Sequence, residues 1–449
     1  MDIRFRYVIA IHQSVFKRNG FFYANLQELS IFEKNQNNEM KTLFYNIKGL
    51  FQVRENNQSI LKGSEMKELP SIKNAFLLVE NDLIADYGSM ENAPTNFDES
   101  VDVSGKMIMP SYIDSHTHIV YAGNREQEFV DRINGLSYDE IYKRGGGILN
   151  SVEKLRKAAE DELYADAANR LEELIALGTG VIEIKSGYGL SLEAELKMLR
   201  VIKKLQENYP VKIKATFLGA HAVPPEFKDN QAGFVDEICN VMIPEIAKLG
   251  LADYVDAFLE TGYFTVDETR KIIKAATKHG LKSKIHINQF TAINGIEMCV
   301  EENVLTVDHL EIVDDADIEA LKKGNTIPVA LPTCSYFISI PYTPARKLLN
   351  ANLPLVIASD YNPGTTPSGN MNFVVATSCI KMKLTPEEAF NAATLNAAYA
   401  LEVENEYGSI TKGKKASFFI TKSIHSIYAI PYNFGSNLIE TVYLQGKKQ

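Results

Sequence analysis

Two histidines stand one residue apart at the end of an apolar stretch, Met107–His118, which reads MIMPSYIDSHTH. In an extended strand alternate side chains point to the same face, so His116 and His118 are placed to bind one metal ion. An isolated His-x-His pair is weak evidence for a metal site. Other parts of the chain must therefore supply further ligands.

Polar residues also follow several other apolar runs of the chain. They are Asp114, Glu183, Lys185, Tyr188, His221, Glu260, His286, Gln289, His309, Asp360 and Asn362. Taken singly, each has a structural explanation: His221 as a hydrogen-bonded core residue, His309 as a partner of Asp308 or Glu311, or Asp360 as a turn cap. Taken together, three imidazoles and a carboxylate around an open position are typical of catalytic zinc or iron sites.

The elements that must position these residues alternate between strand-like and helix-like segments, a pattern typical of βαβ units. Eight apolar runs are suited to buried parallel strands: Ile108–Ile113, Gly180–Ile184, Ile213–Leu218, Tyr254–Leu259, Ser283–Ile287, Leu305–Val307, Thr326–Leu331 and Leu355–Ala358. The sequence therefore predicts an α/β fold with a (β/α)8 TIM-type barrel. In such barrels the active site lies at the carboxyl ends of the strands, where the polar residues fall.

Helix boundaries are also predicted by local signals. Ser191 is expected to cap a helix that stops at Pro210, and Thr265 with Glu268 forms a capping box. Thr385 followed by Pro386 opens another helix, and His279 is expected to end one.

Both ends of the chain are rich in short strand-like runs, at 42–53, 75–88, 101–110, 409–421 and 438–445. We expect a small β-sandwich domain formed by residues 40–109 and 402–449, flanking a barrel at 110–401. Residues 1–39 have no sustained hydrophobic period. We interpret them as an N-terminal extension, either disordered or upstream of the expressed protein, and assign it no function.

Composition excludes several classes of protein. The chain has 449 residues, 45% of them hydrophobic, and a net charge of −10, which argues against nucleic acid as a partner. No apolar run reaches the ~20 residues needed to cross a bilayer. Arg4, Arg6 and His12 interrupt the apolar start, so we expect no signal peptide.

The four cysteines, at positions 239, 299, 334 and 379, are widely spaced. This spacing is typical of free thiols in a reducing cytoplasm and not of a disulfide framework or a thiolate zinc site. We therefore expect a cytoplasmic protein whose metal is held by histidine and carboxylate.

The pattern of His-x-His after the first strand, single histidines after the fifth and sixth, and Asp after the eighth resembles the amidohydrolase superfamily. Within it, seven segments resemble the imidazolonepropionase family of histidine degradation: HTHIVYAGNREQEF, RGGGI, EIKSGYGL, TFLGAHAVPP, HINQF, DHLE and SDYNPGTTPS. The resemblance runs from about Met40 to the C-terminus.

This resemblance implies roles for individual residues. It implies that one metal ion, zinc or iron, is bound by His116, His118, His286 and Asp360. It implies that substrate or product is held by Arg125, Tyr188, His221, Gln289, Asn362, Gly364 and Thr365. For Arg125, an ion pair with Glu126 or Glu128 is the alternative. The family also implies a homodimer that acts on a small molecule.

Gln289 and Lys185 both bear on how the site would work. Gln289 stands where many members of the superfamily have Glu, which removes one candidate proton carrier. Members of the superfamily with two metals bridge them by a carboxylated lysine, but the SGYG context of Lys185 resembles the one-metal family, so we expect Lys185 to be uncarboxylated.

The implied reaction is the opening of 4-imidazolone-5-propanoate by water to N-formimidoyl-L-glutamate. Asp360 is expected to carry the proton from water to the leaving nitrogen, and His221 and His309 to stabilise the oxyanion or orient the water. Which of Asp360 and His309 is the main proton carrier stays open. The alternatives are a heterocycle deaminase on the same barrel and an inactive barrel that serves as a scaffold.

Overall fold

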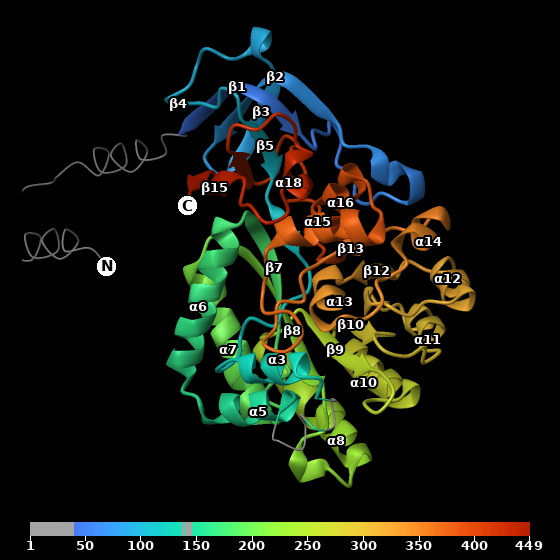
Figure 1. Cartoon of the computed structure of the whole chain (residues 1–449). Coiled ribbons are helices and arrows are strands. Elements are labelled where there is room, and N and C mark those ends of the chain that lie inside the picture. The colour runs from blue at the N-terminus through green and yellow to red at the C-terminus, as the bar shows by residue number, and fades with distance from the viewer. Residues whose placement is uncertain (1–39, 137–139, 141–145) are drawn as a thin grey trace, which may run out of the picture. The chain divides into compact units, whose positions relative to one another are not determined.

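A computed structural model describes residues 40–136, 140 and 146–449, and Figure 1 shows the arrangement of their elements. The predicted extension at residues 1–39 lies outside these described residues. Within them, no helix combines the length and apolar character needed to cross a membrane.

The barrel consists of eight parallel strands that neighbour one another in chain order. They are β6 (Tyr112–Asp114), β7 (Thr179–Lys185), β8 (Lys212–Ala220), β9 (Tyr254–Leu259), β10 (Lys282–Ile287), β11 (Thr306–His309), β12 (Ile327–Ala330) and β13 (Val356–Ile357). Each contains residues of one predicted run, so the predicted fold class is confirmed. Nearly all of their residues are buried, as expected of parallel strands covered by helices.

The last barrel strand, β13, and the first, β6, come together next to the predicted metal ligands. Thr117 and Tyr361 form a parallel bridge there. The amide of Asp360 donates to the carbonyl of His116 over 3.0 Å, and the amide of His118 donates to the carbonyl of Tyr361 over 2.8 Å. The backbone contacts that join the two ends of the barrel sheet thus also fix the positions of three candidate ligands.

The prediction that Ile108–Ile113 forms one barrel strand was wrong in extent. Within this run the chain leaves the second sheet and enters the barrel. β5 (Met107–Pro110) belongs to the second sheet and β6 to the barrel. The amide of Ser111 donates to the carbonyl of Ser417, directly before the second-sheet strand that begins at Phe418, whereas the next amide, of Tyr112, donates to the carbonyl of Gly178 beside β7. A strand that passes from one sheet to another without a turn leaves no break in its apolar pattern.

Helices follow the barrel strands and lie outside them (Figure 1). They include α3 (Glu126–Ile133), α5 (Ile148–Lys157), α6 (Glu160–Ala176), α7 (Leu192–Asn208), α8 (Gln231–Glu237), α9 (Ile243–Leu249), α10 (Val266–Lys278), α11 (Ile296–Glu301), α12 (Asp315–Leu321), α13 (Pro332–Ile338), α14 (Ala345–Asn350), α15 (Met371–Met382), α16 (Pro386–Ala393) and α17 (Leu395–Ala400).

The predicted caps are confirmed. The Ser191 side chain accepts from the amide of Ala194 at the start of α7, and capping boxes begin α10 and α16. His279 is the residue that ends α10.

The second sheet is built from both ends of the chain, as predicted. Its strands are β1 (Lys41–Phe51), β2 (Ser71–Glu80), β3 (Leu83–Ser89), β4 (Glu99–Asp102), β5, β14 (Phe418–Thr421), β15 (Ile439–Leu444) and β16 (Lys447–Lys448). β5 joins the two halves, because it pairs with β1 on one side and with β14 on the other. The short helix α18 (Ala429–Tyr432) lies between β14 and β15 in the chain. The domain limits remain a proposal, with the small β domain at residues 40–109 and 402–449 and the barrel at residues 110–401.

Candidate active site

A cavity of about 410 Å³ opens at the carboxyl ends of the barrel strands. It is lined by His118, Arg125, Ile148, Tyr188, His221, Phe258, Tyr263, His286, Gln289, Phe290, His309, Asp360, Asn362 and Thr365. Of the residues predicted to form the site, His116 and Gly364 are the two outside this lining. His116 is completely buried beside His118.

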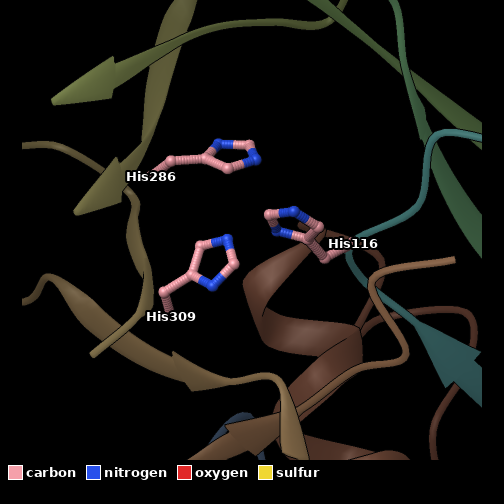
Figure 2. A group of neighbouring side chains, drawn as sticks. All are labelled: His116, His286 and His309. Carbon is pink, nitrogen blue, oxygen red and sulfur yellow. The ribbon is translucent and has the colours of Figure 1, made fainter. Parts of the chain in front are cut away.

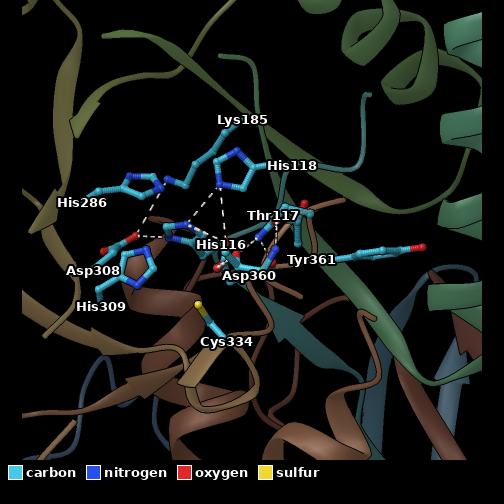
Figure 3. Close-up of polar contacts among 12 residues, drawn as sticks. His116, Thr117, His118, Lys185, His286, Asp308, His309, Cys334, Asp360 and Tyr361 are labelled. Carbon is cyan, nitrogen blue, oxygen red and sulfur yellow. Dashed lines mark hydrogen bonds and ion pairs between the residues drawn. The ribbon is translucent and has the colours of Figure 1, made fainter. Parts of the chain in front are cut away.

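Three donor atoms of the predicted metal ligands form a triangle in this region (Figure 3). Nε2 of His116 and Nε2 of His118 are 3.4 Å apart, and Oδ1 of Asp360 lies 3.6 Å from each of them. Metal–ligand bonds of about 2.0–2.2 Å in a tetrahedral site separate neighbouring ligand atoms by roughly 3.4 Å. The three atoms therefore have the spacing that a single bound metal ion requires.

His286 and His309 approach the same place from β10 and β11. Figure 2 shows their rings gathered with that of His116, and the three histidines offer ligand nitrogens that lie within 4.8 Å of one another. The cluster thus contains the predicted ligand His286 and a fourth imidazole, His309, at comparable distance.

A buried carboxylate lies close to the Nδ1 atom of two of these histidines, and it is hydrogen-bonded at His116 but only within ion-pair distance at His286. Asp308 Oδ2 is 2.6 Å from Nδ1 of His116, and Asp256 Oδ2 is 2.9 Å from Nδ1 of His286. The hydrogen bond at Nδ1 of His116 fixes the orientation of that ring and leaves its Nε2 lone pair for a metal.

The protonation state of the cluster also suits metal binding. Burial, together with the neighbouring charges of Lys185 and other histidines, holds the pKa of His116 and of His118 well below the usual value. Both imidazoles are therefore neutral at neutral pH, the form that coordinates metals. Nδ1 of His118 is buried without a hydrogen-bond partner among the described residues. The donor set of imidazole nitrogens and a carboxylate fits a divalent transition metal.

Two of the site residues adopt left-handed backbone conformations. His309 has φ +89° and Asp360 has φ +57°. Positive φ is uncommon in residues other than glycine, although Asp and His adopt it more often than most, and it costs about 1–3 kcal/mol at each position. The surrounding fold thus holds His309 in a strained conformation that turns its ring toward the cluster.

Tyr188 and His221 form one side of the cavity. Nδ1 of His221 lies 3.1 Å from the carbonyl of Gly187, and burial lowers the pKa of His221 to about 3. A neutral ring that donates through Nδ1 presents Nε2 as an acceptor. Gly187 has φ +107°, and a Cβ there would meet Nδ1 of His221 at 3.0 Å. The glycine is therefore required for this contact.

The loop after β13 forms another side. Thr365 Oγ1 donates to Asp360 Oδ2 over 3.3 Å. The Asn362 side chain donates to the Asp360 carbonyl and to Thr365 Oγ1, and accepts from the amides of Gly364 and Thr365. Since both ends of its amide are engaged, Asn362 shapes the loop.

The comparisons with known proteins agree with this geometry. The chain matches the model of the amidohydrolase family over residues 107–448. It is 63% identical over 409 residues to the imidazolonepropionase of Flavobacterium johnsoniae, covering 91% of this chain and 100% of that protein. It is 40% identical over 391 residues to the imidazolonepropionase of Alkaliphilus oremlandii, covering 86% of this chain and 92% of that protein.

The chain belongs to the imidazolonepropionases of the amidohydrolase family.

Solved structures of more distant proteins share the fold of this imidazolonepropionase family member. A guanine deaminase from C. acetobutylicum superposes with a TM-score of 0.66 at 15% identity, covering 91% of this chain and 99% of that chain. An adenosine deaminase from Xanthomonas campestris, with bound zinc, gives a TM-score of 0.63 at 13% identity, covering 91% and 92%. At these identities the likeness concerns the fold alone.

Lys185 is enclosed within the barrel. Its Nζ lies 2.7 Å from Glu183 Oε1 and 2.9 Å from Asp256 Oδ2. Burial by itself lowers the pKa of this lysine, but the carboxylates of Asp256, Glu183 and Asp308 outweigh it and raise the pKa above the usual value. A protonated amine is not nucleophilic. These contacts therefore support the prediction that Lys185 is uncarboxylated.

Several residues of the site are absent from the sequence-based prediction. Phe258 and Tyr263 form an aromatic wall, with ring centroids 4.4 Å apart. Asp256 could have been predicted as a site residue, because it is a carboxylate in the middle of the apolar run YVDAFL. Cys334 has its sulfur within 4.8 Å of ligand atoms of His309 and Asp360, although the cysteine spacing gave no reason to place a thiol near the metal. The four cysteines are free.

Proposed function

We propose that the chain opens the cyclic amide 4-imidazolone-5-propanoate with water to give N-formimidoyl-L-glutamate, in histidine degradation. The observation that carries this proposal is the triangle of donor atoms from His116, His118 and Asp360 beside a cavity whose wall also contains Arg125. Two relatives that match this chain over their whole lengths at 63% and 62% identity are named imidazolonepropionase, which supports the same substrate.

The metal would be held by His116, His118, His286 and Asp360, and would be zinc or iron, since imidazole and carboxylate suit both. A bound divalent metal lowers the pKa of its water to about 7 and polarises a carbonyl, which is the activation that cyclic-amide hydrolysis needs.

Asp360 would move the proton. Its Oδ1 faces the Nε2 atoms of His116 and His118, whereas its Oδ2 accepts from Thr365 Oγ1 on the side of the cavity. The two oxygens can therefore have separate tasks. Oδ2 takes a proton from the attacking water and returns it to the departing ring nitrogen.

His221 would orient the attacking water and His309 would stabilise the oxyanion. The sequence left open which histidine performs which task. Nε2 of the neutral His221 is an acceptor, which suits it to orient the attacking water. For His309, burial lowers the pKa, but Glu311, Asp360 and Asp308 outweigh it and raise the pKa. A histidine that holds its proton can donate to a developing oxyanion.

Arg125 would bind the propanoate tail through its guanidinium, and Tyr188 and Gln289 would contact the ring. The Gln289 amide lines the cavity, where its weak 3.5 Å contact with Cys334 Sγ is easily exchanged for a substrate hydrogen bond. An amide cannot titrate, which favours ring opening over deamination, because deamination needs a proton carrier at the leaving amine.

The test compares two reactions of the purified protein after elemental analysis. We expect one zinc or iron per chain and ring opening of freshly prepared imidazolone propanoate, and no comparable release of ammonia from guanine, cytosine or adenosine. Faster ammonia release would establish the deaminase instead, and a metal-free protein without either activity would establish the scaffold.

The remaining expectations are also proposals. We infer a cytoplasmic location, supported by four free cysteines, and a homodimer, supported by the family resemblance. Light scattering with in-line sizing checks the oligomer, and fractionation of cells checks the location.

A further inference from the structure

Five charged side chains are enclosed in the barrel beneath the proposed metal site. They are Glu183, Lys185, Asp256, Lys284 and Asp308, and each side chain is 0% exposed. Burying charges is unfavourable unless they are paired and hydrogen-bonded. Because this group lies next to the proposed metal ligands, it can affect how those ligands are positioned.

Lys185 lies at the centre of three carboxylates. Its Nζ is 2.7 Å from Glu183 Oε1, 2.9 Å from Asp256 Oδ2 and 3.8 Å from Asp308 Oδ2. Figure 3 shows the side chain extending toward the group formed by His286, His116 and Asp308. One ammonium thus contacts carboxylates from strands β7, β9 and β11.

The aspartate oxygens near Lys185 are the same atoms that face the histidines. Asp256 Oδ2 is 2.9 Å from both Lys185 Nζ and His286 Nδ1. Asp308 Oδ2 is 2.6 Å from His116 Nδ1 and 3.8 Å from Lys185 Nζ. Lys185 thus shares one oxygen with His116, through a hydrogen bond of Asp308, and one with His286, where Asp256 lies within ion-pair distance without a hydrogen bond.

The remaining contacts of the aspartates hold their side chains in place. Asp256 Oδ1 accepts from the amides of Ala257 and His286, and Asp308 Oδ1 accepts from Thr306 Oγ1 over 2.6 Å. With each Oδ1 engaged elsewhere, Lys185 and the histidine share Oδ2. A carboxylate held on both oxygens cannot turn away from its imidazole.

We propose that Lys185 is the positioning residue that sets His116 and His286 in one common, metal-binding orientation through Asp308 and Asp256. This inference rests on the proposed metal site. A metal ligand whose outer partner is removed typically loses about 10–100-fold in metal affinity. The effect of Lys185 would reach two ligands at once.

Lys284 supplies a matched control. It is equally buried and also pairs with Glu183, but its other bond runs to the carbonyl of Ser115 over 2.9 Å. Lys185→Met and Lys284→Met each remove one enclosed ammonium. A role in positioning requires the first to weaken metal binding far more than the second.

The experiment measures the dissociation constant for Zn²⁺ by competition with a chelator, for the unmutated chain and both variants. We expect a loss of 10-fold or more in Lys185→Met and less than threefold in Lys284→Met. In the metal-free proteins, ¹⁵N-histidine spectra report which ring nitrogen carries the proton. We expect Nδ1–H for His116 in the unmutated chain, because Asp308 accepts there, and mixed tautomers of His116 in Lys185→Met.

If Lys185→Met does not fold, the same measurements are made on Lys185→Met combined with Glu183→Gln, which removes one charge of each sign. Equal Zn²⁺ affinity and unchanged tautomers in the Lys185 variant would overturn the inference. Equal losses of Zn²⁺ affinity in both lysine variants would also overturn the inference, because removal of either buried ammonium would then have the same effect. Absence of Zn²⁺ binding by the unmutated chain would instead refute the proposed metal site.

Discussion

Glu128 Oε2 accepts hydrogen bonds from both Nε and Nη2 of Arg125, over 2.9 and 2.6 Å. The two side chains are 9% and 13% exposed. The other oxygen, Oε1, accepts from the amide of Gly147. Arg125 nevertheless lines the cavity, so the ion pair left open by the sequence and the proposed contact with a substrate carboxylate are compatible. Glu128 fixes one edge of the guanidinium and leaves the other for a ligand.

Arg125→Lys should raise KM for imidazolone propanoate and lower kcat/KM by about 10–100-fold, because charge-assisted hydrogen bonds contribute roughly 1.5–3 kcal/mol and lysine cannot reproduce the planar contact. Metal content should stay at the unmutated level, as measured by elemental analysis. An unchanged kcat/KM would mean that another residue holds the carboxylate.

Gly364→Ala tests whether space beside Arg125 matters. A Cβ at Gly364 would overlap Nη1 of Arg125. We expect the displaced guanidinium to raise KM at least fivefold with little change in bound metal. Gly435→Ala is the control, since a Cβ there meets nothing within 4 Å. Equal KM values in the two variants would contradict this account of Gly364.

His116→Ala and His286→Ala should each lose bound metal and turnover together, since either change removes a nitrogen from the cluster. His279→Ala, at the exposed end of α10, should keep both. Elemental analysis after dialysis against a weak chelator measures the outcome. Full metal occupancy in both cluster variants would refute the ligand assignment.

Asp360→Asn should lose nearly all ring opening, by about 10³-fold or more, because it impairs ligation by Oδ1 and proton transfer at Oδ2. Gln289→Glu should retain measurable ring opening, since Gln289 carries no proton in the proposed reaction. Initial rates at saturating metal separate the two effects. Comparable activity of Asp360→Asn would overturn the assignment of the proton carrier.

Lys414 makes the stability of the fold depend on pH. Burial lowers the pKa of Lys414 to about 8 from 10.5, although its Nζ donates to the Tyr407 carbonyl and to Ser409 Oγ. Between these pH values the unfolded chain binds more protons than the folded one, so stability rises with pH in this window. Below about pH 8 the folded state bears the full cost of a buried ammonium.

Lys414→Met should remove this dependence. We expect its free energy of unfolding, relative to that of the unmutated chain, to fall by about 1 kcal/mol or more as pH rises from 8 to 10, where one pKa unit corresponds to about 1.4 kcal/mol. Urea titrations at several pH values measure the difference. Parallel pH profiles for the two proteins would contradict the shifted pKa.

The sequence by itself determined which segments become strands and helices, and which strand ends carry imidazoles and carboxylates. These features are local: the capping box of Thr265 and Glu268 joins residues three apart, and the buried strand Tyr254–Leu259 is one unbroken apolar run. Local hydrogen bonding and periodicity leave their signal in neighbouring residues, so they can be predicted without a tertiary structure.

Only the tertiary structure decided which side chains meet. Asp308 reaches His116 across 192 residues of sequence, and Lys185 reaches Asp256 across 71. Closure of the barrel also decided that Ser111 separates two sheets and that Cys334 lies beside Asp360. Contacts of this kind depend on the register between strands and on which face each side chain takes, and a shift of one residue would turn every side chain of a strand to the opposite face. No local pattern contains that information, because it arises only when all the strands close on one another.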